Sequence, residues 1–246
     1  MVVAMDTIAK ETIALVTGAN KGLGRETARR LGALGWTVLL GARDPDRGQL
    51  AAGELAADGL DVRFLPLDVT SDESVSDAVD IVKGEYGRLD VLVNNAGIGG
   101  AWIDVLDTGP DDFRACYETN VYGPVRMTRA FVPLLRQADV PRIVMVSSGM
   151  GSLTVTTDPS RLESQLLGLA YPSSKTALNM ITTQYAKALQ EFKVNAVDPG
   201  YTATDLNGHR GYKTVEQGAE AIVSMAVLDA GGPTGQYVDD AGPVPW

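Results

Sequence analysis

The sequence predicts a single α/β domain built on a doubly wound, mainly parallel sheet of seven strands, with helices on both faces. Two observations lead to this prediction. Short apolar runs rich in β-branched residues alternate along the 246 residues with longer stretches of helical periodicity, and such alternation is typical of parallel strands joined by helical crossovers. Gly-rich and polar clusters follow the first, fourth, fifth and sixth apolar runs, at the sheet edge where ligands bind in folds of this class.

The apolar runs expected to form strands cover residues 12–16, 36–40, 62–67, 89–93, 142–146, 194–197 and 236–238. The first helix is predicted over 22–34, because its apolar residues recur at three- and four-residue steps, and Gly35 ends it. Asp44 followed by Pro45 is typical of a capped helix start, and that helix is expected to reach residue 57.

Ser71 and the acids after it suit the N-terminus of a helix over 71–86. A long helix over 110–137 is expected to be interrupted near Gly123-Pro124, since proline removes a backbone donor. Further helices are predicted over 171–191 and 215–228, and a short one over 161–167 within the mixed stretch 149–169.

Composition excludes several classes of function. The net charge is −10 and no block rich in Lys or Arg stands out, so nucleic acid is not expected as a partner. No apolar run approaches the roughly 18 residues that span a membrane, and residues 1–11 lack a secretory pattern and are expected to form a disordered tail. A single cysteine, Cys116, and a single histidine, His209, exclude an internal disulfide and Cys- or His-rich metal sites. No metal and a cytoplasmic location are therefore predicted.

The Gly-rich stretch between the first strand and the first helix predicts a dinucleotide site. It reads Thr17-Gly18-Ala19-Asn20-Lys21-Gly22-Leu23-Gly24. Glycines let the backbone approach a pyrophosphate, and the helix N-terminus offers free N–H groups and the positive end of its dipole. The spacing differs from the commoner Gly-x-Gly-x-x-Gly, and a tight strand-to-helix turn is the alternative reading.

Tyr171 and Lys175 lie four positions apart at the start of a predicted helix, so they share one face. An ammonium near a phenol favours the phenolate, so Lys175 is expected to lower the pKa of Tyr171. Tyr171 then becomes a candidate general acid and base near neutral pH. On spacing alone, a surface packing pair is the commoner explanation.

Taken in order, Thr-Gly-x-x-x-Gly-x-Gly at 17–24, Asn94-Asn95-Ala96-Gly97, Ser148 and Tyr171-x-x-x-Lys175 resemble the motifs of the short-chain dehydrogenase/reductase family, whose fold is Rossmann-type. The resemblance extends from residue 12 to the C-terminus. It is nearest to the single-domain, carbonyl-reductase-like branch, through Asn20-Lys21, Ala42-Arg43-Asp44 and the extended stretch before Tyr171.

The resemblance implies four catalytic roles. Tyr171 is the acid and base, and Lys175 lowers its pKa and binds the nicotinamide ribose. Ser148 binds the substrate carbonyl oxygen, with Ser147 as the rival position. Asn120, on the long helix, supports a proton relay through a held water.

The resemblance also implies NADP(H) as the cofactor. After the second strand no acid precedes Asp44, and Arg43 with Lys21 suits a 2′-phosphate. The implied cofactor contacts are Gly18, Asn20, Lys21, Gly22, Leu23, Gly24, Arg43, Asp68, Val69, Asn94, Ala96, Gly97, Tyr171, Lys175, Pro199, Gly200, Thr202 and Thr204.

The implied activity is reduction of a ketone or aldehyde by NADPH. The alternatives are an NAD-dependent alcohol dehydrogenase working oxidatively, and a non-catalytic NADP(H)-sensing protein. The expected partner is a small carbonyl or alcohol substrate, and the candidate pocket residues are Met150, Leu153, Trp102, Tyr201 and Leu206.

Ser148 and Tyr171 are separated by 23 positions, more than in most compact members of the family. The excess lies around 157–167, where a much larger insertion accompanies monomers among carbonyl-reductase-like members. Monomer and homo-oligomer both stay open for this chain. His209, in the loop after the sixth strand, is read as an exposed loop residue.

Overall fold

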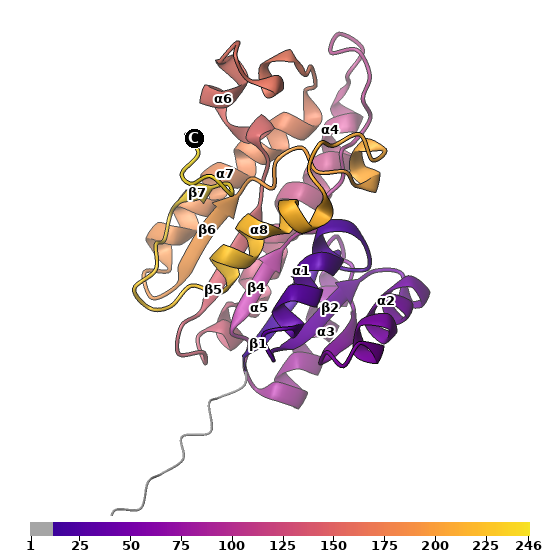
Figure 1. Cartoon of the computed structure of the whole chain (residues 1–246), viewed down its shortest axis with the longest axis vertical. Coiled ribbons are helices and arrows are strands. Elements are labelled where there is room, and N and C mark those ends of the chain that lie inside the picture. The colour runs from indigo at the N-terminus through magenta and orange to yellow at the C-terminus, as the bar shows by residue number, and fades with distance from the viewer. Residues whose placement is uncertain (1–11) are drawn as a thin grey trace, which may run out of the picture.

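In the computed structural model, which describes residues 12–246, a central sheet separates two layers of helices (Figure 1). The tail expected at 1–11 lies outside the described residues. The strands are β1 (Ile13–Thr17), β2 (Thr37–Ala42), β3 (Val62–Pro66), β4 (Val91–Asn94), β5 (Arg142–Val146), β6 (Lys193–Val197) and β7 (Tyr237–Val238). Their order is β3-β2-β1-β4-β5-β6-β7, and every neighbouring pair is parallel. The predicted doubly wound seven-stranded sheet is confirmed.

The helices are α1 (Gly22–Gly32), α2 (Pro45–Ala57), α3 (Asp72–Tyr86), α4 (Pro110–Tyr117), α5 (Gly123–Leu135), α6 (Leu153–Thr157), α7 (Ala170–Ala188) and α8 (Val215–Ala226). Two predicted capping signals are confirmed. The Asp44 carboxylate accepts the backbone N–H of Arg47 at 3.1 Å, and the Ser71 hydroxyl accepts that of Ser74 at 3.2 Å.

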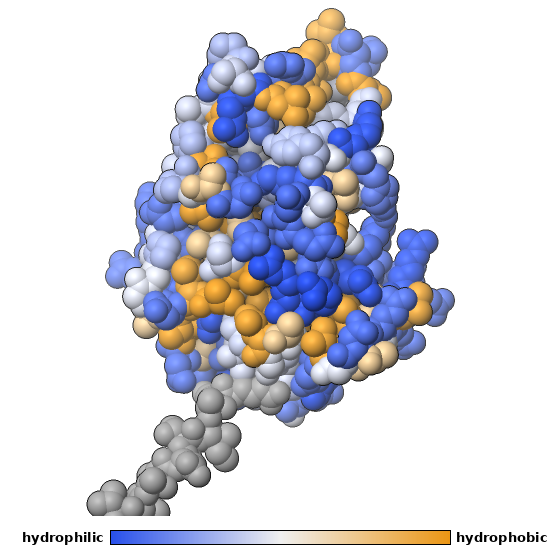
Figure 2. Space-filling view, in the orientation of Figure 1, coloured by the Kyte–Doolittle hydropathy of each residue, from blue (hydrophilic) through white to orange (hydrophobic). Residues whose placement is uncertain are grey.

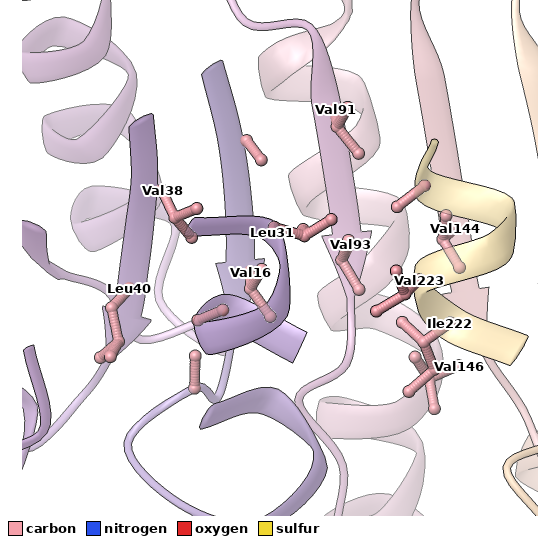
Figure 3. Close-up of a cluster of buried hydrophobic side chains, with 14 of the residues drawn as sticks. Val16, Leu31, Val38, Leu40, Val91, Val93, Val144, Val146, Ile222 and Val223 are labelled. Carbon is pink, nitrogen blue, oxygen red and sulfur yellow. The ribbon is translucent and has the colours of Figure 1, made fainter. Parts of the chain in front are cut away.

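Strand side chains alternate between the two helical layers, so the sheet is buried on both faces. Ala14 and Val16 of β1 join a core with α1, α2 and α8, part of which Figure 3 shows around Leu31, Ile222 and Val223. Ile13 and Leu15 point to the opposite core, which is shared with α3, α5 and α7. Because strands buried on both faces tolerate little polar substitution, these runs read as continuous apolar stretches in the sequence.

The long helix predicted over 110–137 is interrupted just before Pro124, the proline on which that prediction was based. A five-residue π-helical turn, Glu118–Tyr122, joins α4 to α5, and Pro124 occupies the first turn of α5. A proline cannot donate to the carbonyl four residues earlier, which here belongs to Asn120, and its ring crowds that carbonyl. The wider turn accommodates this conflict and places Asn120 in the interior, where it is fully buried.

The stretch between β5 and α7 contains three short helical turns: Gly149–Gly151, α6 and Leu162–Gln165. The helix predicted over 161–167 is only the last of these, a 3₁₀ turn. Helix α6 was not predicted, because Thr154, Val155 and the two following threonines are poor helix formers. The Ser152 hydroxyl accepts the N–H of Val155 at 3.0 Å, and this cap starts the turn.

Among residues 12–246, no helix combines the length and the apolar character that crossing a bilayer requires.

Candidate active site

A cleft of about 1390 Å³ lies at the carboxyl ends of the central strands. The strand order reverses between β1 and β4, and loops that leave a parallel sheet on either side of such a point diverge and open a crevice. The walls come from the glycine loop after β1 and from the loops after β4, β5 and β6. The cleft is large enough for a dinucleotide together with a small second molecule.

The glycine loop forms the floor of one end of the cleft. Gly18 has a φ of +62°, which side chains rarely adopt. A β-carbon at Gly24 would lie 2.5 Å from the Asn95 Nδ2 atom and 2.7 Å from the Gly18 carbonyl oxygen. Within the described chain, no side chain caps α1, and its first turn carries no acid. The N–H groups at the start of α1 are therefore free to bind an anion.

Nearly all the residues implied as cofactor contacts line this cleft; the exception is Asn94. Its side chain is buried below the sheet edge, where its amide contacts the Thr128 hydroxyl at 3.5 Å and the Met145 sulfur at 3.3 Å. Asn95, which the sequence did not single out, lines the cleft instead. It donates to the Thr17 carbonyl at 2.8 Å and fixes the glycine loop to β4.

Two charged residues, Arg43 and Asp44, follow β2, and their surroundings differ. Arg43 is exposed and lines the cleft, whereas Asp44 caps α2 and also pairs with Arg47 at 3.4 Å. Lys21, expected to act beside Arg43, instead pairs with Asp205 at 2.5 Å across the cleft. His209 binds the other oxygen of Asp205 at 2.7 Å. Arg43, by contrast, forms no ion pair with another side chain among residues 12–246.

The two serines at the end of β5 face in different directions. Ser147 is buried, and its hydroxyl donates to the Asn179 side-chain oxygen at 2.6 Å. Ser148 lines the cleft, and its side chain lies close enough to that of Tyr171, at the start of α7, to act on the phenol. Of the two serines, Ser148 is the one next to the phenol, and its role as the catalytic serine stays a prediction.

Lys175 lies one helical turn after Tyr171, but the hydrogen bond recorded for its ammonium goes to a backbone carbonyl. Its ammonium donates to the Val146 carbonyl at 2.8 Å and lies 5.6 Å from the centre of the Tyr171 ring. Burial raises the pKa of Tyr171 to about 12 and lowers that of Lys175 to about 8. The expected lowering of the Tyr171 pKa is therefore wrong for this structure, because removal from water dominates and the nearby Asp198 adds to it.

Asn120 does not line the cleft, and its side chain is fully used within the protein. Its oxygen accepts the N–H of Ile98, and its amide donates to the Ile98 carbonyl, both at 2.9 Å. The same amide contacts the Ser174 hydroxyl at 3.0 Å. Asn120 therefore ties the loop after β4 to the start of α7, beside the catalytic candidates.

Asp198 is a site residue that the sequence analysis missed. It directly follows β6, lines the cleft and is 4% exposed. Its carboxylate accepts the N–H of Gly200 at 2.8 Å and lies beside Gly149, so it contacts the loops after β5 and β6. Burial, with Glu163 and Asp239 nearby, raises the pKa of Asp198. An acid directly after a buried strand was a signal that could have identified it.

Apolar side chains from three loops surround the mouth of the cleft. Trp102 packs on Tyr171 with ring centres 6.0 Å apart, and Leu162, Leu166 and Leu206 lie nearby. Figure 2 shows exposed apolar surface at this end of the molecule, near α4 and α6. Met150, Trp102, Tyr201 and Leu206 line the cleft as expected; Leu153 does not, and it is exposed on α6.

No group of three or more His, Cys, Asp or Glu side chains within residues 12–246 is arranged to hold a metal ion.

Comparison with known proteins places these features in a family. The family model described as short chain dehydrogenase matches residues 12–214. The (+)-neomenthol dehydrogenase of Arabidopsis thaliana is 36% identical and aligns with 90% of this chain and 94% of its own length. Carbonyl reductase [NADPH] 1 of Mus musculus is also 36% identical, over 95% of this chain and 98% of that protein. The crystal structure of NADPH-bound carbonyl reductase from chicken fatty liver superposes with a TM-score of 0.84 at 28% identity, covering 96% of this chain and 99% of that one.

Proposed function

The chain belongs to the short-chain dehydrogenase family of oxidoreductases, and from this premise we propose that it is an NADPH-dependent carbonyl reductase that converts a ketone or aldehyde into an alcohol. The observation that carries the proposal is the convergence of Ser148 and Tyr171 on one wall of the cleft, with Lys175 one turn away. Two hydroxyls that converge on one point can hold and protonate a carbonyl oxygen.

Tyr171 acts as the general acid. With its pKa raised to about 12, the phenol keeps its proton at neutral pH, which is the state that reduction requires. The hydroxyl of Ser148 donates a hydrogen bond to the substrate oxygen and holds it next to the phenol. The same raised pKa works against oxidation at neutral pH, because the reverse reaction needs the phenolate to accept a proton.

Lys175 stabilises the charge that develops as Tyr171 gives up its proton. Its pKa of about 8 leaves most of the ammonium protonated at pH 7. The side chain is 4% exposed, so its charge acts through a medium that screens less than water. Asn120 fixes the loop that carries Gly97 and Ile98 against α7. Its support of a proton relay through a held water stays part of the proposal.

The residues present suit a nicotinamide dinucleotide. The uncapped start of α1 and the glycine loop fit its pyrophosphate. When bound, NADPH would supply the hydride. Arg43 favours NADP over NAD, since a guanidinium at this position can hold a 2′-phosphate with two hydrogen bonds. Asp44, the nearest acid, is occupied in capping α2 and is not free to bind a ribose hydroxyl.

The substrate is expected to be a small molecule with an apolar body. The mouth of the cleft beside Tyr171 is formed by Trp102, Leu162, Leu166 and Leu206, and burying apolar surface there contributes roughly 25 cal/mol per Å². A panel of ketones and aldehydes, screened by NADPH consumption, would identify the substrate class.

The catalytic assignment is tested by Tyr171→Phe. We expect turnover to fall by about 10²–10⁴-fold, since general acid catalysis contributes that much, while NADPH still binds, as measured by its fluorescence. Tyr212→Phe is the control, because that tyrosine is 70% exposed. Full activity of Tyr171→Phe, or loss of NADPH binding, would contradict the assignment. NADPH binding without turnover of any carbonyl by the unaltered protein would favour the sensing alternative.

The cofactor assignment is tested by Arg43→Ala. Losing one charge-assisted contact to a phosphate costs about 1.5–3 kcal/mol, so the dissociation constant of NADPH should rise by roughly 10- to 150-fold. That of NADH should change little. Arg47→Ala is a matched control on α2, since Arg47 is exposed and pairs with Asp44. Equal affinity for NADPH before and after Arg43→Ala would leave the NAD-dependent alternative favoured.

A further inference from the structure

The last strand of the sheet contacts the back of the loop that carries Ser148. Tyr237 of β7 is 1% exposed, and its hydroxyl lies 2.6 Å from the backbone carbonyl oxygen of Ser148. A carbonyl only accepts, so the tyrosine hydroxyl must donate. Burial raises the pKa of Tyr237, which keeps that proton in place. The second bond to the same carbonyl comes from the N–H of Gly151 at 2.7 Å.

This loop is also held by α7. Asn179, one turn after Lys175, accepts the Ser147 hydroxyl at 2.6 Å and donates to the Gly151 carbonyl at 3.2 Å. The loop Ser148-Gly149-Met150-Gly151 contains two glycines, so its own backbone preferences do little to fix it. Within the loop, the Ser148 hydroxyl accepts the N–H of Met150 at 3.3 Å, and bonds from other elements add to this local contact in fixing where Ser148 points.

Tyr237 is itself held by the end of the chain. Trp246 stacks on its ring, with centres 5.3 Å apart and planes inclined by 27°. The Ser152 hydroxyl donates to the Pro245 carbonyl at 2.6 Å, and the N–H of Val244 donates to the Tyr237 carbonyl at 2.8 Å. Residues 244–246 thus bind both the tyrosine and the segment that follows the serine loop.

We propose that Tyr237, held by residues 244–246, is a positioning residue for Ser148: its hydrogen bond fixes the backbone from which the serine hydroxyl reaches the substrate oxygen. This inference rests on the proposed function, because it assigns Tyr237 an effect only through Ser148. Tyr237 lies behind the loop, outside the residues that line the cleft, so it does not touch substrate or cofactor.

A double-mutant cycle on Tyr237→Phe and Ser148→Ala tests the proposal. Phe keeps the ring and its packing and removes only the hydroxyl. A misplacement of about 1 Å can cost as much as 100-fold in rate, so for a smaller shift we expect kcat to fall about tenfold. The KM and the dissociation constant of NADPH should stay within about twofold, because the glycine loop is untouched. In the Ser148→Ala background, Tyr237→Phe should have no further effect on kcat.

Tyr86→Phe is the matched control. It also removes a tyrosine hydroxyl with a hydrogen bond, from Arg63 at 2.9 Å, but at the C-terminal end of α3, and kcat should not change. If Tyr237→Phe does not fold, Trp246→Ala removes the stacking partner at a position 41% exposed and enters the same cycle, with a smaller expected loss in the same direction.

The outcomes separate this inference from the proposed function. An unchanged kcat in Tyr237→Phe, or an equal loss with and without the Ser148 hydroxyl, overturns the positioning role while the catalytic assignment stands. If Ser148→Ala itself keeps full activity, the role of Ser148 in the proposed function fails, and the role of Tyr237 fails with it.

Discussion

Asp198 shows how one buried residue shapes the proton chemistry of the cleft. Its carboxylate accepts the backbone N–H of Gly200, and no Lys or Arg within residues 12–246 pairs with it. Tyr171, Tyr237, Glu163 and Asp239 face it, and all of these are neutral or acidic. The negative charge of Asp198 disfavours a phenolate on Tyr171 and adds to the effect of burial on the pKa of that phenol.

Asp198→Asn is therefore expected to lower the pKa of Tyr171. Asn keeps an oxygen that accepts the Gly200 N–H but removes the charge. In the oxidative direction Tyr171 must accept a proton, so the rate rises with pH toward the pKa of about 12. This rise should move to lower pH in the variant, because the phenolate forms more easily. The pH profile of kcat for alcohol oxidation measures the shift.

Asp229→Asn, at an exposed position beyond α8, serves as the control. In the reductive direction near pH 7, the phenol is protonated in both proteins, so charge removal should change that rate little. A rise that keeps its position on the pH axis, or moves to higher pH, would show that Asp198 does not act on Tyr171.

Residue patterns predicted part of this site. The i, i+4 spacing placed Tyr171 and Lys175 on one helix face, and the order of motifs identified Ser148. The direction of the Tyr171 pKa could not be predicted, because a sequence shows which charges are neighbours but not how far they are removed from water. The contact between Tyr237 and Ser148 could not be predicted either, since 89 positions separate the two residues.

At the scale of elements, the glycine loop and α1 depend on close backbone packing. Gly24 is buried in the first turn of α1, where a β-carbon would meet the Gly18 carbonyl at 2.7 Å and the Ala19 α-carbon at 2.8 Å. These are backbone atoms that cannot rotate away. Gly53 lies inside α2, is exposed, and has no atom within 4 Å of the corresponding point.

Gly24→Ala and Gly53→Ala should therefore have opposite effects. Gly53→Ala is expected to raise the free energy of unfolding by about 0.5–1 kcal/mol, the usual difference between alanine and glycine in a helix. Gly24→Ala is expected to lower it by about 1–3 kcal/mol through overpacking and to weaken NADPH binding. Urea unfolding and cofactor titration of both variants measure this. A Gly24→Ala protein with unchanged stability and affinity would contradict the close-packing account.

Elements with local signals were predicted well, and those set by tertiary contacts were not. Helix α2 begins and ends where its Asp-Pro start and Asp-Gly stop predict. The π-helical turn before α5 was located only as an interruption near Pro124, since its form depends on the burial of Asn120 against α7. Helix α6 has unfavourable propensities and depends on its cap and on contacts with the C-terminal residues.

At the scale of the molecule, the cleft joins distant parts of the chain. One wall follows β1 and β2, and the other follows β5 and β6, which lie on the opposite side of the strand reversal. The Lys21–Asp205 pair links the glycine loop to the loop after β6. Both side chains are more than half exposed, so the pair is worth little, and a bound phosphate can compete for Lys21. A dinucleotide bound in the cleft would then contact loops that follow strands in both halves of the sheet.

Because one sheet and two continuous cores run through both halves, residues 12–246 should unfold in a single transition, and NADPH should raise the midpoint temperature of that transition.

At about 100 times its dissociation constant, a ligand adds about 2.7 kcal/mol to the free energy of unfolding. For a chain of this size that corresponds to roughly 5–10 °C. Differential scanning calorimetry with NADPH, and with NADH at the same concentration, measures both effects, and NADH should give the smaller shift because it lacks the phosphate that Arg43 is proposed to hold. Two separate transitions would refute the single-domain prediction, and equal shifts would refute the preference for NADPH.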